Sequence, residues 1–338
     1  MNSDRLNIKR NEGIMRFKKI TSLLVLSTIL AISAIGMTGC SSLGIRSIPL
    51  ETLKEKYNVA DTDFINVDGI NIHYKDEGEG PVLVLLHGIC ASLYTWDGWV
   101  DQLKDRYRII RLDVPGWGLT GPVGKDAYDR NKMITILEKF FDRLDIDTFY
   151  LAGNSLGGYF AWNYALEHPE QVKKMVLLDP VCYPQSVPWF VSAAKIPLIR
   201  VFPKYMMPKF LITMNVKAVY SDDSKITDEI YTTYFDMAMR KGNKSSYIDI
   251  FKFIAQNSKS DLLSKGVENI KTPTLLMYGQ DDEWVSPDQA KLWVRDIPGI
   301  KHIIYDGVGH IPMEELPLVS AKDADSFFSE PETPYSGY

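Results

Sequence analysis

The segment that most constrains this chain is the short turn at residues 152–158. It follows the apolar run 149–151 and precedes a helix-forming stretch, which predicts a β-strand, a sharp turn and an α-helix in that order. Gly153 and Gly157 flank Ser155 at the G-x-S-x-G spacing, as expected where strand and helix approach so closely that a Cβ atom would collide. We therefore predict that the Ser155 hydroxyl is exposed at the edge of a sheet.

The helix after this turn would begin beside the Ser155 hydroxyl. Its unpaired backbone N–H groups and the positive end of its dipole favour negative charge, so an oxyanion that forms there meets donors already aimed at it. This arrangement suits a nucleophile. A glycine-rich turn also precedes ordinary helices of α/β proteins, so the motif alone leaves both interpretations open.

Composition restricts the class of protein. The chain has 338 residues, of which 45% are hydrophobic and 24% are charged. These values suit one large α/β domain or two small ones, and they indicate neither disorder nor a coiled coil. The formal net charge is -5, and the sequence has no zinc-type Cys/His cluster, P-loop or dinucleotide-binding glycine motif. These features argue against nucleic acid as a partner.

Residues 1–39 have the pattern of a signal peptide. Basic residues between Arg16 and Lys19 precede the uncharged run 20–37, and small residues follow up to Cys40. The end of this segment resembles a bacterial lipoprotein signal, in which cleavage before the cysteine leaves Cys40 as the lipidated N-terminus. An uncleaved membrane helix is the alternative, because the run is just long enough to span a bilayer. Either way, we expect an exported protein held at the extracytoplasmic side of a membrane.

Two further features of the signal and the cysteines remain open. Met15 begins a more compact signal than Met1, and it is the alternative start of the chain. Once Cys40 is assigned to the anchor, Cys90 and Cys182 are the cysteines that remain. Two cysteines make no disulfide framework, so the sequence allows either a pair or two thiols.

Strands and helices alternate from Thr62 onward. An Asp68-Gly69 turn predicts a β-hairpin over residues 64–74, and the uniformly apolar run 81–86 predicts a strand buried on both faces of a parallel sheet. A hairpin followed by β-α repeats predicts a mostly parallel, doubly wound sheet. Further strands are predicted at 107–113, 149–151, 174–178, 274–278 and 302–305, and helices at 96–103, 134–144, 288–294 and 318–328.

A nucleophilic serine needs a base, and His310 is the best placed of the five histidines. It stands in a loop directly after the last predicted strand. His73 and His302 lie within strands, His168 lies at a helix end, and His87 leads into a glycine, where we expect it to brace the following loop. His310 is therefore the candidate base.

The third member should be a carboxylate that orients the imidazole, and it should follow another strand. Asp281, Asp282 and Glu283 all follow the strand 274–278, and spacing alone does not choose among them. Asp179 is a fourth candidate, because it follows the strand next to the serine. We favour a loop-bracing role for it.

Several motifs together resemble the α/β-hydrolase superfamily over roughly residues 60–328. The resemblance implies that Asp282, three residues after Gly279, completes a triad with Ser155 and His310. It also implies an oxyanion hole made by the backbone amides of Ile89 and Leu156. The matching segments in chain order are His87-Gly88, residues 113–118, the turn 153–157, Gly279-x-x-Asp282-x-x-x-x-Pro287 and Gly309-His310-x-Pro312-x-x-Glu315-x-Pro317.

The same resemblance implies a chemistry. Cys90 occupies the second glycine position of the family's His-Gly-x-Gly loop. Serine at position 155 argues against the members with an aspartate nucleophile, the haloalkane dehalogenases and epoxide hydrolases. Acyl transfer to water by a carboxylesterase or lipase-like enzyme, with a small-molecule ester as substrate and no metal or organic cofactor, is the implied activity.

Two alternatives to an esterase stay open. Hydrolases that cleave carbon–carbon bonds in ring-cleavage products have similar Gly-Asn-Ser-x-Gly-Gly turns. A ligand-binding or signalling member of the fold, which keeps the triad without turnover, is the alternative outside catalysis.

A helical cap is predicted after the sixth strand, because the interruption before residue 274 is too long for a simple connection. Residues 183–220 contain five basic residues, no acidic residue and many apolar ones. We interpret this part either as an apolar acyl pocket with a basic face toward a membrane or as ordinary cap helices with solvated lysines.

The predicted organisation is a signal peptide (1–39), an anchor and linker (40–59), an α/β-hydrolase core in two parts (60–182 and 266–330), the cap (183–265) and a loose tail (331–338).

Overall fold

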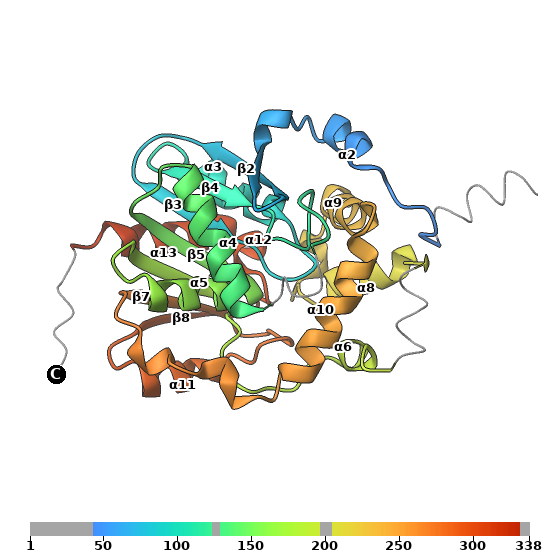
Figure 1. Cartoon of the computed structure of the whole chain (residues 1–338). Coiled ribbons are helices and arrows are strands. Elements are labelled where there is room, and N and C mark those ends of the chain that lie inside the picture. The colour runs from blue at the N-terminus through green and yellow to red at the C-terminus, as the bar shows by residue number, and fades with distance from the viewer. Residues whose placement is uncertain (1–42, 124–128, 197–204, 332–338) are drawn as a thin grey trace, which may run out of the picture.

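An eight-stranded sheet forms the centre of the molecule, with the strand order β1-β2-β4-β3-β5-β6-β7-β8 (Figure 1). The computed structural model describes residues 43–123, 129–196 and 205–331. The pairs β1–β2 and β2–β4 are antiparallel, and every other pair is parallel. The strands are β1 (Phe64–Val67), β2 (Ile70–Glu77), β3 (Val82–Leu86), β4 (Arg108–Leu112), β5 (Phe149–Asn154), β6 (Val172–Leu178), β7 (Thr274–Gly279) and β8 (Lys301–Tyr305).

Both antiparallel pairs involve β2, the second strand of the predicted hairpin. Asp68 and Gly69 connect β1 to β2 with φ values of 51° and 85°, the two left-handed positions that a tight hairpin turn requires. After the hairpin the chain moves to the middle of the sheet, where β3 lies between β4 and β5 and four of its five residues are buried. A uniformly apolar strand suits this position, because helices cover both faces.

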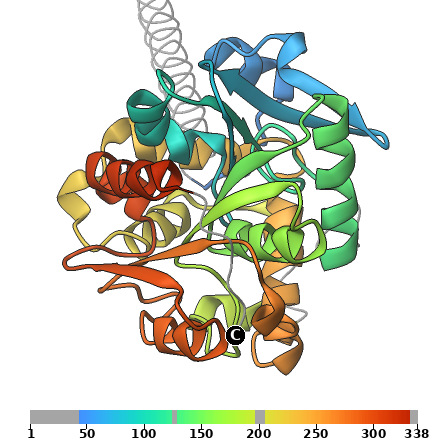
Figure 2. The same ribbon diagram turned by 90° about the vertical axis from the view of Figure 1, so that its left-hand side faces the viewer.

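Helices cover the sheet from both sides (Figure 2). On one face α3 (Asp97–Leu103) and α13 (Pro317–Ser329) pack together, and the Trp99 indole donates to the Ser320 hydroxyl at 2.9 Å. On the other face lie α4 (Arg130–Arg143), α5 (Leu156–Glu167) and α11 (Gln289–Asp296). The aromatic contacts Phe141–Tyr164 and Trp162–Trp293 join these three helices.

Four helices of the described chain form the cap between β6 and β7: α6 (Trp189–Ala193), α8 (Lys209–Lys217), α9 (Asp228–Met239) and α10 (Asn243–Asn257). They lie beyond one end of the sheet (Figure 1). Gly242, with a φ of 101°, separates α9 from α10. The prediction of an α/β-hydrolase fold with an N-terminal hairpin and a helical cap after the sixth strand is confirmed.

The segment before the hairpin, which the sequence suggests is a linker, is folded against the cap. Helix α2 (Leu50–Lys56) buries Leu53 against Val59, Leu119 and Met237. The Ile48 amide donates to the Met239 carbonyl at 2.7 Å. The chain is therefore fixed on the cap well before β1 begins.

The ends of the predicted organisation lie outside the described residues. They include the signal peptide, Cys40 and residues 332–338 of the tail. From residue 43 onward, leaving out 124–128 and 197–204, no helix has the length and apolar character needed to cross a membrane.

Candidate active site

Ser155 lies on a strained turn between β5 and α5. Its φ of 54° and ψ of -117° are values that a residue with a side chain rarely adopts. A Cβ atom on Gly153 would lie 2.6 Å from the Gly157 carbonyl oxygen, and one on Gly157 would lie closer than 3.0 Å to backbone atoms of Leu86. The Ser155 amide donates to the Leu178 carbonyl at 2.9 Å. The neighbouring strands therefore hold the turn.

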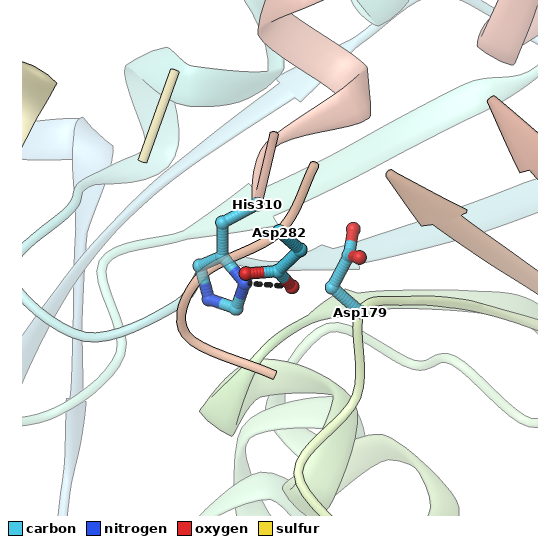
Figure 3. A group of neighbouring side chains, drawn as sticks. All are labelled: Asp179, Asp282 and His310. Carbon is cyan, nitrogen blue, oxygen red and sulfur yellow. Dashed lines mark hydrogen bonds and ion pairs between the residues drawn. The ribbon is translucent and has the colours of Figure 1, made fainter. Parts of the chain in front are cut away.

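His310 and Asp282 meet at the same end of the sheet as this turn. The Nδ1 atom of His310 lies 2.7 Å from Oδ2 of Asp282 (Figure 3). The second oxygen of Asp282 accepts the amides of Trp284 at 2.6 Å and Val285 at 3.0 Å. The Trp284 ring stacks on the imidazole, with the two ring centroids 6.0 Å apart. The Asp282 carboxylate thus holds Nδ1 protonated and leaves Nε2 as the basic atom.

The other acidic candidates have different partners. Asp281 accepts the Ser221 hydroxyl of the cap at 2.7 Å, and Glu283 lines an apolar cavity. Asp179 is fully buried behind Asp282 (Figure 3). One of its oxygens accepts the Gly279 amide at 3.0 Å, which is the loop-bracing role expected for it.

Asp179 also differs from Asp282 in its charge. Burial and the neighbouring Asp282 carboxylate raise the pKa of Asp179 well above its usual range, which favours the protonated form. An uncharged Asp179 leaves a single negative charge beside His310. This arrangement assigns the orienting role to Asp282.

Asp179, Asp282 and His310 also form the one cluster in the described chain whose side-chain atoms lie close enough to bind a metal ion, within 4.8 Å of one another. A metal at this point would have to displace the hydrogen bond between His310 and Asp282. The set has a single nitrogen donor, and burial and Asp282 raise the pKa of the Asp179 carboxyl well above its usual range. These features suit a hydrogen-bonded relay better than an ion.

Ser155 and His310 line one small cavity of about 20 Å³. The Nε2 atom of His310 is buried and has no hydrogen-bond partner among the described residues. An unpartnered basic nitrogen beside a strained serine is arranged to accept a proton. Gly88 and Ile89 belong to the same cavity wall.

Of the two predicted oxyanion donors, Ile89 lines this cavity, and Leu156 directly follows Ser155 in the chain. Ile89 follows β3 in the loop that lines it, and Leu156 is the first residue of α5. Within the described ranges, neither backbone N–H donates a hydrogen bond. Cys90 keeps the left-handed conformation that a glycine would have, with a φ of 58°, and its buried side chain lines the apolar cavity. Cys90 and Cys182 are both free thiols.

Two further residues, neither of them predicted as a site residue, hold His310 in place. The Asn154 side chain donates to the carbonyls of Leu178 at 3.1 Å and His310 at 3.0 Å. Glu315 accepts the amide of Gly309 at 2.6 Å. Both residues stand inside motifs that carry the family resemblance. Asn154 directly precedes the candidate serine, and Glu315 follows the candidate histidine by five residues. These positions were the signal that could have revealed them.

His87 and His73 have structural partners. The His87 Nδ1–H donates to the Gly88 carbonyl at 2.7 Å, and its Nε2 accepts the Val114 amide at 2.9 Å. Burial lowers the His87 pKa, consistent with a neutral ring that braces the loop. His73 is paired with Asp113 at 2.6 Å inside the core.

An apolar cavity of about 790 Å³ lies under the cap next to the small cavity. The two share three wall residues, Asn215, Tyr234 and Trp284. Side chains of α6, α8, α9 and α10 supply most of the wall, and Glu283 is the one charged residue among the described lining residues. The candidate serine thus lines a small cavity that shares part of its wall with a large apolar one.

Comparisons with known proteins agree on the fold and on hydrolysis. A family model described as alpha/beta hydrolase fold matches residues 81–211. The 2-hydroxy-6-oxononadienedioate/2-hydroxy-6-oxononatrienedioate hydrolase of Paraburkholderia phymatum is 30% identical over 250 residues, which cover 71% of this chain and 85% of that protein. The pimeloyl-[acyl-carrier protein] methyl ester esterase of Nitrosomonas europaea is 27% identical over 263 residues, 75% of this chain and 99% of that protein.

A solved structure extends the similarity over more of the chain. A membrane phospholipase A, described as a bacterial virulence factor, superposes with a TM-score of 0.65 at 22% identity, and the match covers 91% of this chain and 97% of that one. At 22% identity, this similarity shows that the two proteins share a fold. The substrate has to be argued from the site.

Proposed function

This chain belongs to the α/β-hydrolase fold family, and from that premise we propose that it is a serine hydrolase that cleaves esters of apolar acyl groups. One observation carries the proposal. Ser155 and the unpartnered Nε2 of His310 line one small cavity, and this cavity shares its wall with a large apolar one. The small cavity supplies a nucleophile and a base, and the large cavity accommodates an acyl chain.

In the first half-reaction, Ser155 Oγ attacks the ester carbonyl carbon while His310 Nε2 takes the hydroxyl proton. The carbonyl electron pair moves to oxygen, and the amides of Ile89 and Leu156 donate to the oxyanion. When the carbonyl reforms, the bond to the leaving alcohol breaks, and the proton on Nε2 passes to that alcohol. Asp282 stabilises the imidazolium through Nδ1.

In the second half-reaction, water attacks the acyl-enzyme. His310 Nε2 takes a proton from the water, the tetrahedral intermediate forms in the same oxyanion site, and the bond to Ser155 Oγ breaks as the proton returns to the serine. The products are a carboxylic acid and an alcohol. No residue outside the Ser155, His310 and Asp282 set is needed to move a proton.

The lining of the large cavity supports an apolar acyl group. The walls include Met207, Ile212, Tyr247 and Phe251, and Glu283 supplies the single charge among the described lining residues. A volume of about 790 Å³ is within the range of sites that enclose a whole small ligand. Esters with extended acyl chains therefore fit better than small polar esters.

Carbon–carbon bond hydrolysis is the second candidate. A relative with 30% identity is named as a hydrolase of a dioate, a substrate with two carboxylates. Two carboxylates would need cationic partners. The described lining residues of both cavities include no lysine or arginine. The cavity therefore favours the ester, as does the similarity to a methyl ester esterase over 99% of that protein.

The location belongs to the proposal as well. We place the mature protein outside the cytoplasm, anchored through lipid on Cys40 or through the uncleaved apolar run 20–37.

The test uses p-nitrophenyl esters of increasing acyl length with the full chain and its Ser155→Ala variant. We expect an optimum at extended acyl chains, and a loss of turnover of several orders of magnitude in the variant. A fluorophosphonate probe, which reacts with activated serines, should label the unsubstituted chain alone. Labelling of Ser155 without turnover of any ester would identify a ligand-binding member of the fold and overturn the proposal.

A further inference from the structure

The exposed large apolar side chains of the described chain are concentrated on one part of the surface. Seven of the twelve lie on residues 43–45 and 189–214, although these two segments are a small part of the chain. Trp189 and Tyr205 are 74% and 73% exposed. We call this set the cap face: Leu43, Ile45, Trp189, Ile196, Tyr205, Phe210 and Met214.

Several contacts bring the two segments together. The Met207 amide donates to the Gly44 carbonyl at 3.2 Å, and the buried Lys244 ammonium donates to the carbonyls of Gly44 and Ile45 at 3.0 Å each. Leu43 and Ile45 are thus fixed beside the start of α8. In Figure 1 the first described residues, α6 and α8 lie on the same side of the molecule, away from the end marked C.

Two residues of the cap face also line the apolar cavity. Trp189 of α6 and Met214 of α8 belong to the cap face and line the cavity at the same time. Phe210 is four residues before Met214, so both project from one side of α8. A surface that contacts these side chains would therefore cover the opening of the cavity.

The chain that precedes the described residues limits what can cover this face. Cys40 is four residues before Gly44, and an extended residue spans at most about 3.6 Å, so a lipid on Cys40 would lie within about 14 Å of Gly44. If the apolar run 20–37 remained as a membrane helix, its last residue would be seven positions before Gly44, about 25 Å at most. Both forms of the anchor hold the cap face near a bilayer.

The charge around the cap face suits an anionic surface. Arg46, Lys195 and Lys209 are exposed, and residues 183–220 contain no acidic residue, although the whole chain has a net charge of -5. Apolar side chains flanked by basic ones are typical of segments that lie in the interface of an anionic bilayer.

We infer that the cap face docks on an anionic phospholipid bilayer, so that acyl lipids pass from the membrane into the apolar cavity without crossing water. The docking is inferred from the exposed side chains of the cap face and from its short distance to the anchor. The passage of substrate rests on the proposed function. The two parts can therefore fail separately.

Docking is tested with the full chain in vesicles of phosphatidylcholine and phosphatidylglycerol. Phe210→Cys receives a fluorophore, and Leu318→Cys on α13, 63% exposed, is the matched control. The buried Cys90 and Cys182 should not react, and the unsubstituted chain reports any signal from Cys40. We expect lipids brominated in the acyl chain to reduce the emission at position 210 several-fold and to leave position 318 unchanged.

Three results would overturn the docking. Equal emission at position 210 with and without brominated lipid would mean that the cap face does not touch the bilayer. Energy transfer between labels at position 210 of different molecules, without quenching by lipid, would assign the face to a second copy of the chain. Equal quenching at positions 210 and 318 would also contradict a specific docking face.

The passage of substrate is tested with Tyr205→Ser/Phe210→Ser, two positions of the cap face that do not line the cavity. We expect hydrolysis of water-soluble p-nitrophenyl acetate to stay within about twofold and hydrolysis of p-nitrophenyl palmitate in the vesicles to fall on the order of tenfold. Equal rates on the palmitate would overturn this part. If the unsubstituted chain hydrolysed neither ester, the proposed function would fail while the quenching result would still stand.

Discussion

Asp282 binds His310 with one carboxylate oxygen and two backbone amides with the other. The first oxygen lies 2.7 Å from Nδ1 of His310, and the second accepts the amides of Trp284 and Val285. These amides fix the carboxylate, so the imidazole can hold its proton only on Nδ1 when it is neutral. The proton-accepting atom then faces the small cavity with Ser155.

Replacing Asp282 with Asn should leave the fold intact and reduce kcat by about 10⁴-fold, because an amide NH₂ facing Nδ1 favours the wrong tautomer of His310. Asp281→Asn is the matched control, since Asp281 contacts the cap hydroxyl of Ser221, and we expect it to keep kcat within about threefold. Ester hydrolysis by the purified variants measures both. Comparable losses in the two variants would contradict the assignment.

Asp179→Asn should reduce kcat by less than about tenfold. The native carboxyl is buried and its pKa is raised by burial and by Asp282, so an uncharged amide of the same size replaces it closely. The amide oxygen can still accept the Gly279 amide, which Asp179 now accepts at 3.0 Å. A loss as large as that of Asp282→Asn would show that Asp179 is ionised and takes part in the relay.

Glu315→Ala should cost about 2–4 kcal/mol of unfolding free energy, because it leaves three backbone amides without their acceptor. Glu315 accepts the amides of Gly309, Ser221 and Asp222 at 2.6, 3.1 and 3.0 Å. Since Gly309 precedes His310, we also expect kcat to fall more than KM rises at temperatures where the variant is folded. Denaturant titration and steady-state kinetics provide the measurements. An unchanged kcat in the folded variant would mean that Glu315 supports the cap alone.

Glu314 should make the stability of the cap depend on pH. Burial raises the pKa of its carboxyl to about 7, although the hydroxyls of Tyr220 and Tyr234 donate to it at 2.7 and 3.2 Å. Asp97 and Glu315, the other charges that act on it, are also acidic. Between the usual pKa of about 4.3 and this value, the folded state binds a proton that the unfolded state lacks, so stability falls as pH rises through 7.

Glu314→Gln isolates this effect, because glutamine keeps the two hydroxyl contacts and cannot ionise. Relative to the variant, the unsubstituted chain should lose at most about 3 kcal/mol of unfolding free energy between pH 5 and pH 8. Denaturant unfolding of both proteins at the two pH values measures the difference. A difference that grows in favour of the unsubstituted chain at pH 8 would have the wrong sign.

Gly157→Ala should be far more disruptive than Gly158→Ala. A Cβ on Gly157 would lie 2.3 Å from the Leu86 carbonyl oxygen and 2.5 Å from that of His87, whereas a Cβ on Gly158 would lie 3.0 Å from the Pro180 ring and 3.1 Å from the Gly153 carbonyl oxygen. We expect a loss above about 3 kcal/mol for the first and near 1 kcal/mol for the second, because a backbone clash cannot relax in the packed centre of the sheet. Equal losses would mean that β3 and α5 can separate.

The sequence predicted much of the fold because its strongest signals are local. The Asp68-Gly69 turn and the uniformly apolar β3 each depend on a few adjacent residues, and the structure places both as expected. The folded segment before the hairpin was missed, because Leu53 is buried only through contacts with Leu119 and Met237, which are distant in sequence.

At the candidate site, too, local motifs could be predicted and contacts between distant residues could not. The family spacing selects Asp282, and the structure places Asp282 on His310, while its catalytic role stays a prediction. The histidine motif marks the position of Glu315 but does not reveal its contacts with the cap, because Ser221 and Asp222 lie more than 90 residues earlier. Likewise, the raised pKa of Asp179 arises from its burial next to Asp282, which no local pattern reveals.

The hydrogen bonds between the cap and the histidine loop set a limit for protein engineering. The His310 amide donates to the Val219 carbonyl at 2.8 Å, and Glu315 accepts the next amides, those of Ser221 and Asp222. The cap is therefore not an interchangeable module as a whole. A chimera that imports the cap of another hydrolase to change acyl preference has to retain residues 219–222 of this chain, and its crossover point belongs after them.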